Sequence, residues 1–260
     1  MTASLLDRLP LWALFCVPFV SILAAIEVGF RFGSARARAQ EHEPPAPVGA
    51  VVGATLGLLA FMIAFTFNST WSRFEARKSL LLDEVNAIST AYLRADLLPE
   101  SQRDATRRLL REYVDLRANV ASLVRQPDGL QQIIVRSEQI QNELWRQVRA
   151  AAATSQAPPV FVNTLNTVFE LHTKRVLFAA RYRIPTVIWS TLCIASFLAM
   201  VGVGFNFGLH ARRSVVANVV IAIMFSVMLA MIADLDRPLT GLLNVSQEPM
   251  IELAGRLERT

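Results

Sequence analysis

The chain has 260 residues, of which 53% are hydrophobic and only 18% are charged. Soluble domains usually carry about a quarter charged residues, and the apolar residues here are pooled in four blocks with the charges between them. This composition excludes a wholly soluble enzyme, a disordered chain and a disulfide scaffold, and it indicates an integral membrane protein. The net charge of +5 does not predict a nucleic-acid partner, because the arginines flank the apolar blocks, as is typical of membrane interfaces.

The four apolar blocks, at 10–30, 48–67, 184–209 and 215–233, are each long enough to be a membrane span. A helix needs about 20 apolar residues to cross a hydrocarbon core of about 30 Å. The first block is longer than the roughly 7–15 apolar residues of a signal peptide, and this length favours a retained span over a cleaved one.

The order of these blocks predicts the domain organisation. Residues 1–71 hold the first two spans, 72–183 a helical domain, 184–235 the last two spans, and 236–260 a C-terminal segment. Four spans put both termini and the helical domain on one side, where basic residues near the span ends are more numerous. By the positive-inside rule this side is the cytoplasm, so we expect a multi-pass protein of the bacterial inner membrane with both termini cytoplasmic.

The second span is expected to continue into the helical domain as one long helix, because no Gly or Pro occurs from Leu58 to Leu98. Such a helix would measure about 62 Å, twice the thickness of the membrane core. Pro99 is expected to end it, and Ser101 to cap the next helix. The other apolar stripes have helical spacing. The predicted fold class is therefore all-α, with four transmembrane helices and a cytoplasmic helical bundle inserted between the second and third.

No catalytic motif is present, so the sequence does not predict an enzyme. Both cysteines fall inside apolar blocks, and the three histidines lie far apart without ligand-type spacing. We therefore expect no cofactor and no metal centre of the usual motifs.

Small residues recur along the second span. Gly49, Gly53 and Gly57 form two consecutive GxxxG patterns, which let another helix approach closely. The partner helix can belong to the same protomer or to another copy, and the pattern does not decide between the two.

Just beyond these glycines, Phe61 and Phe65 lie one turn apart, with Leu58 nearby. If several copies surround an axis, the phenylalanine rings would form a hydrophobic constriction, which gates by dewetting. In the alternative arrangement they face lipid or neighbouring helices. The polar residues that follow are expected to form the mouth of such a pore, and Arg73 and Arg77 would attract anions there. These neutral polar residues are Thr66, Asn68, Ser69 and Thr70.

Residues 64–78 resemble a signature of bacterial bestrophins. The matching elements are Phe65, Asn68, Trp71, Arg73-Phe74 and Glu75-Ala76-Arg77, with one residue fewer between Arg73 and Glu75 than in that family. A later motif, Asp234-Leu235-Asp236-Arg237-Pro238 followed by Gly241 and Val245-Ser246, resembles the prokaryotic bestrophin-like proteins. The layout of four spans with a helical insert is also similar to the family.

The resemblance implies a homo-oligomeric anion channel, pentameric as in bestrophins, that conducts inorganic ions such as chloride through an apolar neck of the second span. Aligned on the family, Phe61 and Phe65 take two neck positions. The third falls on Gly57, which has no side chain, so Leu58 is the nearest substitute. The alternative function is a non-conducting membrane scaffold or sensor that binds a partner through its cytoplasmic helices.

Acidic residues at the span ends are further candidates. Glu27 is a functional candidate because it is an intramembrane acid, although it could also reach the interface or pair with Arg31. Asp234, Asp236 and Arg237 follow the fourth span, where we expect an internal Asp–Arg interaction that fixes the C-terminal segment. A cation site is the alternative, since animal bestrophins carry an acidic calcium clasp in a comparable region.

Overall fold

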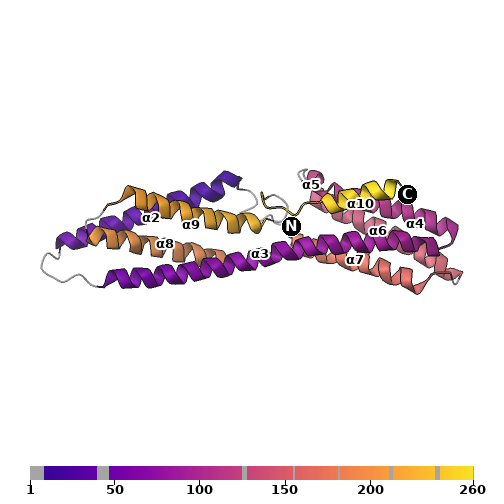
Figure 1. Cartoon of the computed structure of the whole chain (residues 1–260), viewed down its shortest axis with the longest axis horizontal. Coiled ribbons are helices and arrows are strands. Elements are labelled where there is room, and N and C mark those ends of the chain that lie inside the picture. The colour runs from indigo at the N-terminus through magenta and orange to yellow at the C-terminus, as the bar shows by residue number, and fades with distance from the viewer. Residues whose placement is uncertain are drawn as a thin grey trace. The chain divides into compact units, whose positions relative to one another are not determined.

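The computed structural model describes residues 9–39, 47–124, 128–154, 156–180, 182–210, 213–237 and 241–259. These ranges are helical and contain no strand, so the all-α class is confirmed. The helices in chain order (Figure 1) are α2 (Leu11–Ala39), α3 (Val48–Arg94), the 3-10 turn η1 (Ala95–Leu97), α4 (Glu100–Ala118), α5 (Val120–Leu123), α6 (Gly129–Ala153), α7 (Pro159–Ala180), α8 (Thr186–Leu209), α9 (Val215–Leu235) and α10 (Glu248–Glu258).

Four helical segments of the described chain are long and apolar enough to cross a membrane. They are Leu11–Ala39, Val48–Leu97, Thr186–Leu209 and Val215–Leu235. Each corresponds to one of the apolar blocks of the sequence, so the prediction of four candidate spans is confirmed by length and composition.

The first compact unit comprises Met1–Ser72 and Arg183–Leu243. In it α2 lies beside α8 and α9 (Figure 1), and its core contains buried side chains such as Ile26, Leu59 and Leu192. Glycines allow the backbones of α2 and α8 to approach closely, because a Cβ added at Gly204 would overlap the carbonyl oxygen of Ile26. Gly29, Gly33 and Gly208 stand equally close to backbone atoms of the opposite helix.

α3 runs without interruption for 47 residues, which is about 70 Å at 1.5 Å per residue. The prediction of one long helix from the second span is therefore correct. Its residues up to Ser72 belong to the first unit and those from Arg73 onward to the second. In both parts a single side of the helix is buried, with Leu59 and Ile63 in the first unit and Leu81 and Ile88 in the second.

The start of α4 differs from the prediction. Pro99, with extended backbone angles (φ −56, ψ 151), occupies the N-cap position, and no side chain caps the helix. Ser101 lies inside the first turn, where its hydroxyl contacts the side chain of Gln102 at 2.8 Å. The fixed φ of proline interrupts the helical backbone. Helix α4 therefore begins at Glu100, directly after Pro99, without a capping hydroxyl.

The second compact unit comprises Arg73–Tyr182 and Asn244–Thr260. Helices α4 and α6 pack together, and α10 packs on α4. The apolar stripes predicted for this region meet in one core, where Tyr113, Ile140 and Phe161 are fully buried. Met250 and Leu253 of α10 are also part of this core, so the last helix of the chain completes it.

Candidate functional site

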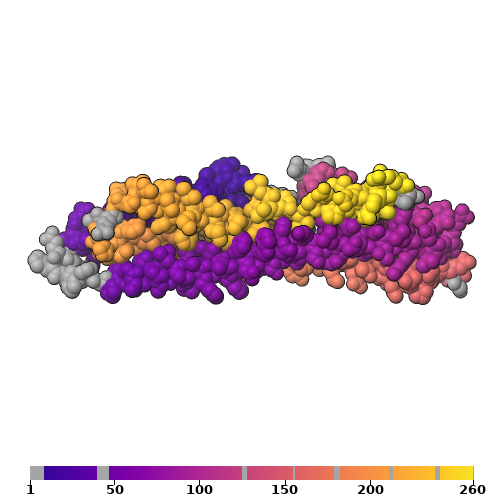
Figure 2. All heavy atoms as spheres, viewed as in Figure 1, coloured from indigo at the N-terminus to yellow at the C-terminus, as the bar shows by residue number. Residues whose placement is uncertain are grey.

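One face of α3 is left uncovered within the first unit. Phe61 and Phe65 are 68% and 67% exposed, and Leu58 on the same side is also exposed. Leu59 and Ile63, on the opposite side, are buried. In the space-filling view the atoms of α3 form an uncovered band along one edge of the unit (Figure 2). The structure thus brings the three expected neck residues onto one apolar surface.

The glycines of α3 share this uncovered face. A Cβ added at Gly53 or Gly57 would meet nothing within 4 Å, and one at Gly49 would come no nearer than 3.8 Å to Asn206 Oδ1. Contact inside the unit is made elsewhere on α3, where Val52 Cγ2 lies 3.3 Å from the Cβ position of Gly202. Of the two arrangements left open by the sequence, Gly53 and Gly57 do not make the close packing within the protomer.

The expected polar mouth divides into two sides of α3. Thr66 and Thr70 are buried, and their hydroxyls donate to the carbonyls of Met62 and Phe67 at 2.7 and 2.8 Å. Threonine in a helix commonly bonds back to its preceding turn. Only Asn68 is exposed, and Ser69 is half-buried. Thr66 and Thr70 thus lie on a different side of α3 from Asn68, and the pore mouth stays a prediction.

Arg73 and Arg77 follow the buried side as well. Both are half-buried, and the guanidinium of Arg77 lies 6.0 Å from the ring centroid of Phe74. Positions 66, 70, 73 and 77 are spaced by four and three residues, and this spacing keeps them on one side of a helix. That side is turned away from Phe61 and Phe65. The expectation that the two arginines attract anions at the pore mouth stays a prediction.

Glu27 is held by two arginines. Its carboxylate accepts a hydrogen bond from Arg31 Nε at 2.9 Å and a second from Arg213 Nη2 at 3.1 Å. Arg31 is the partner that the sequence suggested, whereas Arg213 lies before α9 and was not anticipated. The acid thus ties α2 to the segment between α8 and α9.

Asp234 and Asp236 bind backbone amides. The Asp234 carboxylate accepts from the N–H groups of Leu242 and Leu243, each at 2.8 Å, and Asp236 Oδ1 accepts from Ile184 N at 2.9 Å. A Cβ at Gly241 would come 2.8 Å from the carbonyl oxygen of Asp234, so glycine permits this approach. Arg237 is buried beside them, and Pro238 of the motif lies outside the described residues.

These contacts show what the two carboxylates do in the fold: each fixes a chain segment beside α9. No group of three or more His, Cys, Asp or Glu side chains that could hold a metal ion occurs among the residues described by the structure. An Asp–Arg interaction within this motif stays a prediction.

Comparison with known proteins now gives the family. The family model for the bestrophin-like domain matches residues 16–250, which is most of the chain. The chain belongs to the bestrophin-like family. This confirms the resemblance read from residues 64–78 and from the motif around Asp234. At the level of the family, a bestrophin-like chain is a membrane protein and an ion channel.

Solved structures support the same fold. Two crystal structures of a bacterial bestrophin homologue from Klebsiella pneumoniae, each with a single substitution, match this bestrophin-like chain with a TM-score of 0.64 and 15% identity. Each match covers 94% of this chain and 96% of the other. A crystal structure described as a membrane protein matches with a TM-score of 0.62 and 13% identity, covering 94% of this chain and 95% of the other. No curated protein sequence matches the chain.

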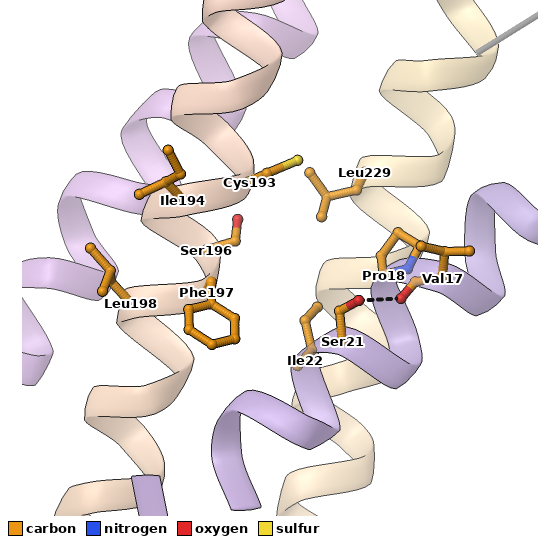
Figure 3. A pocket seen from close by; sticks show the side chains of 10 residues that line it. All are labelled: Val17, Pro18, Ser21, Ile22, Cys193, Ile194, Ser196, Phe197, Leu198 and Leu229. Carbon is orange, nitrogen blue, oxygen red and sulfur yellow. Dashed lines mark hydrogen bonds between the residues drawn. The ribbon is translucent and has the colours of Figure 1, made fainter. Parts of the chain in front are cut away.

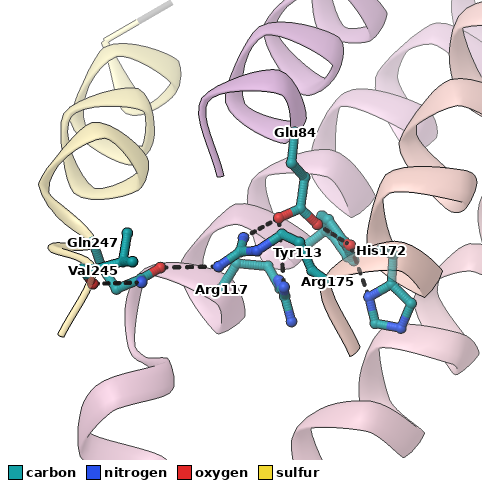
Figure 4. Close-up of polar contacts among 7 residues, drawn as sticks. All are labelled: Glu84, Tyr113, Arg117, His172, Arg175, Val245 and Gln247. Carbon is teal, nitrogen blue, oxygen red and sulfur yellow. Dashed lines mark hydrogen bonds and ion pairs between the residues drawn. The ribbon is translucent and has the colours of Figure 1, made fainter. Parts of the chain in front are cut away.

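The sequence did not reveal a buried polar cluster in the second unit of this bestrophin-like chain (Figure 4). Glu84 of α3 is completely buried, and its Oε1 accepts a hydrogen bond from Tyr113 Oη at 2.7 Å. Its Oε2 pairs with Arg117 at 3.5 Å and with Arg175. Arg175 also donates to Gln247 Oε1 at 3.2 Å. Helices α3, α4 and α7 therefore meet at one carboxylate, and Arg175 links it to Gln247 at the start of α10.

His172 completes this cluster. Its Nδ1 lies 3.1 Å from Tyr113 Oη, and the single hydroxyl proton of Tyr113 is donated to Glu84. His172 must then donate from Nδ1 to the tyrosine oxygen, which assigns the Nδ1–H tautomer of the neutral ring.

The environment shifts the pKa values of these groups. Glu84 lies about 25 Å along α3 beyond Phe67, outside the apolar segment. Burial alone would raise its pKa, but the charges of Arg117 and Arg175 and the hydrogen bonds outweigh burial and lower the pKa to about 2. Burial, together with the charge of Arg117, lowers the pKa of His172 to about 4. At neutral pH the cluster therefore holds an ionised Glu84 and a neutral His172.

Proposed function

We propose that the protein is a homo-oligomeric ion channel whose pore is lined by the uncovered face of α3. The observation that carries the proposal is the position of Phe61 and Phe65, which are about two-thirds exposed in the protomer on a face that ends in exposed Asn68. Large aromatic side chains uncovered side by side mark a surface that another molecule covers. Several copies of α3 around an axis would cover the glycines and leave a phenylalanine ring facing the path.

The physical basis of gating would be dewetting. A ring of phenylalanine side chains is too apolar to hold water in a narrow path, so ions pass only when the ring widens. The open Cβ positions of Gly53 and Gly57 allow neighbouring helices to approach closely on one side of this ring. Because Gly57 supplies no side chain, the neck of this chain is formed by Phe61 and Phe65, with Leu58 at its margin.

We propose anions as the conducted ions and five copies as the assembly, both by resemblance to bestrophins. The net charge of +5 is compatible with attraction of anions, whereas Arg73 and Arg77 lie on the other side of α3 and act at most at long range. A reversal potential measured in a chloride gradient tests the selectivity. Native mass spectrometry of the purified oligomer tests the number of copies.

The second unit and both termini are assigned to the cytoplasm of a bacterial inner membrane. This assignment rests on the positive-inside rule and on the even number of candidate spans. Protease treatment of sealed inside-out vesicles should degrade the second unit, and the same treatment of right-side-out vesicles should leave it intact. The reverse pattern would refute the orientation.

The experiment for conduction is ion flux in liposomes that contain the purified oligomer. Phe65→Ala removes the ring and should raise the flux several-fold, because a small side chain lowers the barrier to wetting. Phe32→Ala in α2 is a matched control, since Phe32 is 66% exposed and belongs to another span. It should leave the flux unchanged. A folded oligomer that gives no flux with either the natural chain or Phe65→Ala would refute the channel.

A non-conducting scaffold or sensor is the second candidate, and one feature favours it. A groove of about 510 Å³ lies between α3 and α7 in the second unit. Its walls carry polar side chains, including Asn86, Arg94 and Asn163. Such a surface suits a polar protein partner. Silent liposomes together with a partner that dissociates on Asn163→Ala substitution would favour this function over conduction.

A further inference from the structure

A second feature of the first unit lies away from the α3 face. A cavity of about 410 Å³ is bounded by α2, α8 and α9 (Figure 3). Pro18 and Ile22 of α2, Phe197 of α8 and Leu229 of α9 are among its walls. Ile194 and Leu198, which also line it, are exposed, so the cavity reaches the surface of the unit. Pockets that bind small molecules have volumes of roughly 300–1,000 Å³ and mostly apolar walls with few polar groups.

Two serines line this cavity, Ser21 and Ser196, and Ser196 is the one whose hydroxyl has no partner in the described structure. Its side chain is only 4% exposed, and its hydroxyl oxygen is buried without a hydrogen-bond partner. In the close-up the hydroxyl points into the space between α8 and the other two helices (Figure 3). Ser21, across the cavity, is satisfied within its own helix by donating to Val17 O at 2.7 Å. A buried hydroxyl left unsatisfied costs about 1–3 kcal/mol, so a bound molecule with an oxygen atom would relieve this cost.

The depth of Ser196 indicates where that molecule comes from. Ser196 lies about 15 Å along α8 from its first residue, which is near the middle of a hydrocarbon core of about 30 Å. Water is scarce at that depth, and the cavity opens on a surface of exposed aliphatic and aromatic side chains. The molecule that reaches it must therefore dissolve in the bilayer and still carry an oxygen.

We propose that this cavity binds a slender, long-chain lipophile with a single hydroxyl or carbonyl oxygen, which forms a hydrogen bond with Ser196. The chain fills the apolar cavity between Ile22, Phe197 and Leu229, and the oxygen satisfies the serine. This site does not depend on the α3 face, and it exists whether or not the protein conducts.

The test is photolabelling of the full-length oligomer in liposomes with a long-chain alcohol that carries a diazirine. Labelled residues, mapped by mass spectrometry, should concentrate in 17–22 and 193–198. Ser196→Ala should raise the alcohol concentration at half-maximal labelling about fivefold, which corresponds to the loss of one net hydrogen bond of about 1 kcal/mol. Ser226→Ala is the matched control, because Ser226 is also fully buried without a hydroxyl partner but does not line the cavity. It should leave the labelling unchanged.

A second variant and a second probe keep the proposal open to refutation. Leu229→Phe narrows the cavity and should abolish competition by unlabelled alcohol. A diazirine alkane of equal length, which lacks oxygen, should label the cavity weakly and respond equally to both serine variants. The proposal is overturned if the alkane labels as strongly as the alcohol, if label spreads evenly over the exposed residues of the spans, or if the cavity is labelled only in dissociated protomers, since a second copy would then occupy it.

Discussion

Each half of α3 buries one side within its own unit, and the two halves expose opposite chemistry. From Gly49 to Phe65 every exposed residue is small or apolar, and the buried side includes Thr66 and Thr70. Beyond Ser72 most exposed positions are polar or charged, whereas the buried side is apolar around one carboxylate, Glu84. The exposed polar positions of this second half are Glu75, Lys78, Ser79, Asp83 and Asn86.

This difference shows that the exposed residues of a helix indicate whether it faces water or an apolar medium, while its buried residues indicate which side chains pack against it. An uncovered apolar side is stable only against lipid or another protein, and a polar one suits water. Changes on the exposed side of the first half should therefore affect assembly and flux, and changes on the buried side of the second half should affect stability.

The largest difference between two variants is expected when leucine replaces a glycine of the uncovered α3 face in one and a glycine of the α2–α8 contact in the other. Gly57→Leu adds a side chain where the protomer has open space, so the protomer should fold as well as the natural chain, while flux falls because the larger side chain obstructs the close approach of neighbouring copies beside the proposed neck. Gly204→Leu forces a side chain into the backbone of Ile26, and α2 and α8 must separate. We expect most of this variant to be lost as aggregate in size-exclusion chromatography. Similar elution of the two variants would contradict the conclusion that Gly57 faces open space and Gly204 a tight helix contact.

Glu84→Gln should be the next largest effect. It leaves Arg117 and Arg175 without their carboxylate in a buried site, and removal of one partner from a buried ion pair costs about 3–5 kcal/mol. Glu75→Gln, at an exposed position of the same helix, should change the free energy of unfolding by less than about 0.5 kcal/mol. Thermal unfolding of the purified variants measures both. Equal melting temperatures would mean that the cluster does not stabilise the second unit.

The stability of the second unit should depend on pH through His172 of α7. The pKa of His172 is lowered from its ordinary 6.5 to about 4 in the folded chain, so between these values the unfolded chain binds a proton that the folded chain does not. The contribution of the neutral His172 to the free energy of unfolding is fully present above pH 6.5. It falls as the pH decreases toward 4, by up to about 3 kcal/mol.

His172→Asn keeps a donor for Tyr113 and cannot titrate, so its unfolding free energy should be nearly constant over this range. His210→Asn is the control, because His210 is exposed and its Nδ1 lies 2.8 Å from the carbonyl oxygen of Asn206, one turn earlier in its own helix. That variant should retain the full loss. Urea unfolding at pH 7, 6 and 5 gives the slopes, and an unchanged slope for His172→Asn would refute the assignment.

The smallest expected effect is a gain in stability. Gly53→Ala should stabilise α3 of the dissociated protomer by about 0.5–1 kcal/mol, because glycine is unfavourable inside a helix and a methyl group meets nothing within 4 Å in the protomer. Gly29→Ala should destabilise the chain, since its Cβ overlaps the carbonyl oxygen of Val201. Melting temperatures in detergent distinguish the two variants. Changes of the same sign would contradict the conclusion that the face of α3 at Gly53 is open.

Much of the fold could be predicted from composition and periodicity. The four spans and the long helix depend on local properties: run length, and the absence of Gly and Pro after Leu58. The side of Thr66 and Thr70 could also have been predicted, because the helical repeat places residues one and five positions after Phe65 away from it. Their polarity suggested a mouth, but the hydroxyls are satisfied by their own helix.

The cluster around Glu84 could not have been predicted in the same way. Its partners Tyr113, Arg117 and Arg175 lie 29, 33 and 91 residues away in the chain, and each resembles an ordinary charged or polar residue of an amphipathic helix. The glycines of α2 and α8 carried a visible signal, since Gly29–Gly33 and Gly204–Gly208 repeat the four-residue spacing of α3. Spacing alone does not tell which set is buried.

The position of α10 has a consequence for the synthesis of the protein. Met250, Leu253 and Leu257 occupy the core of the second unit, and Leu257 accepts a hydrogen bond from Arg111, 146 residues earlier in the chain. Translation releases the N-terminal parts of a chain first, at about 5–20 residues per second. Helices α4, α6 and α7 are therefore made well before the residues that complete their core. The second unit therefore reaches its final packing only after α8 and α9 have been synthesised.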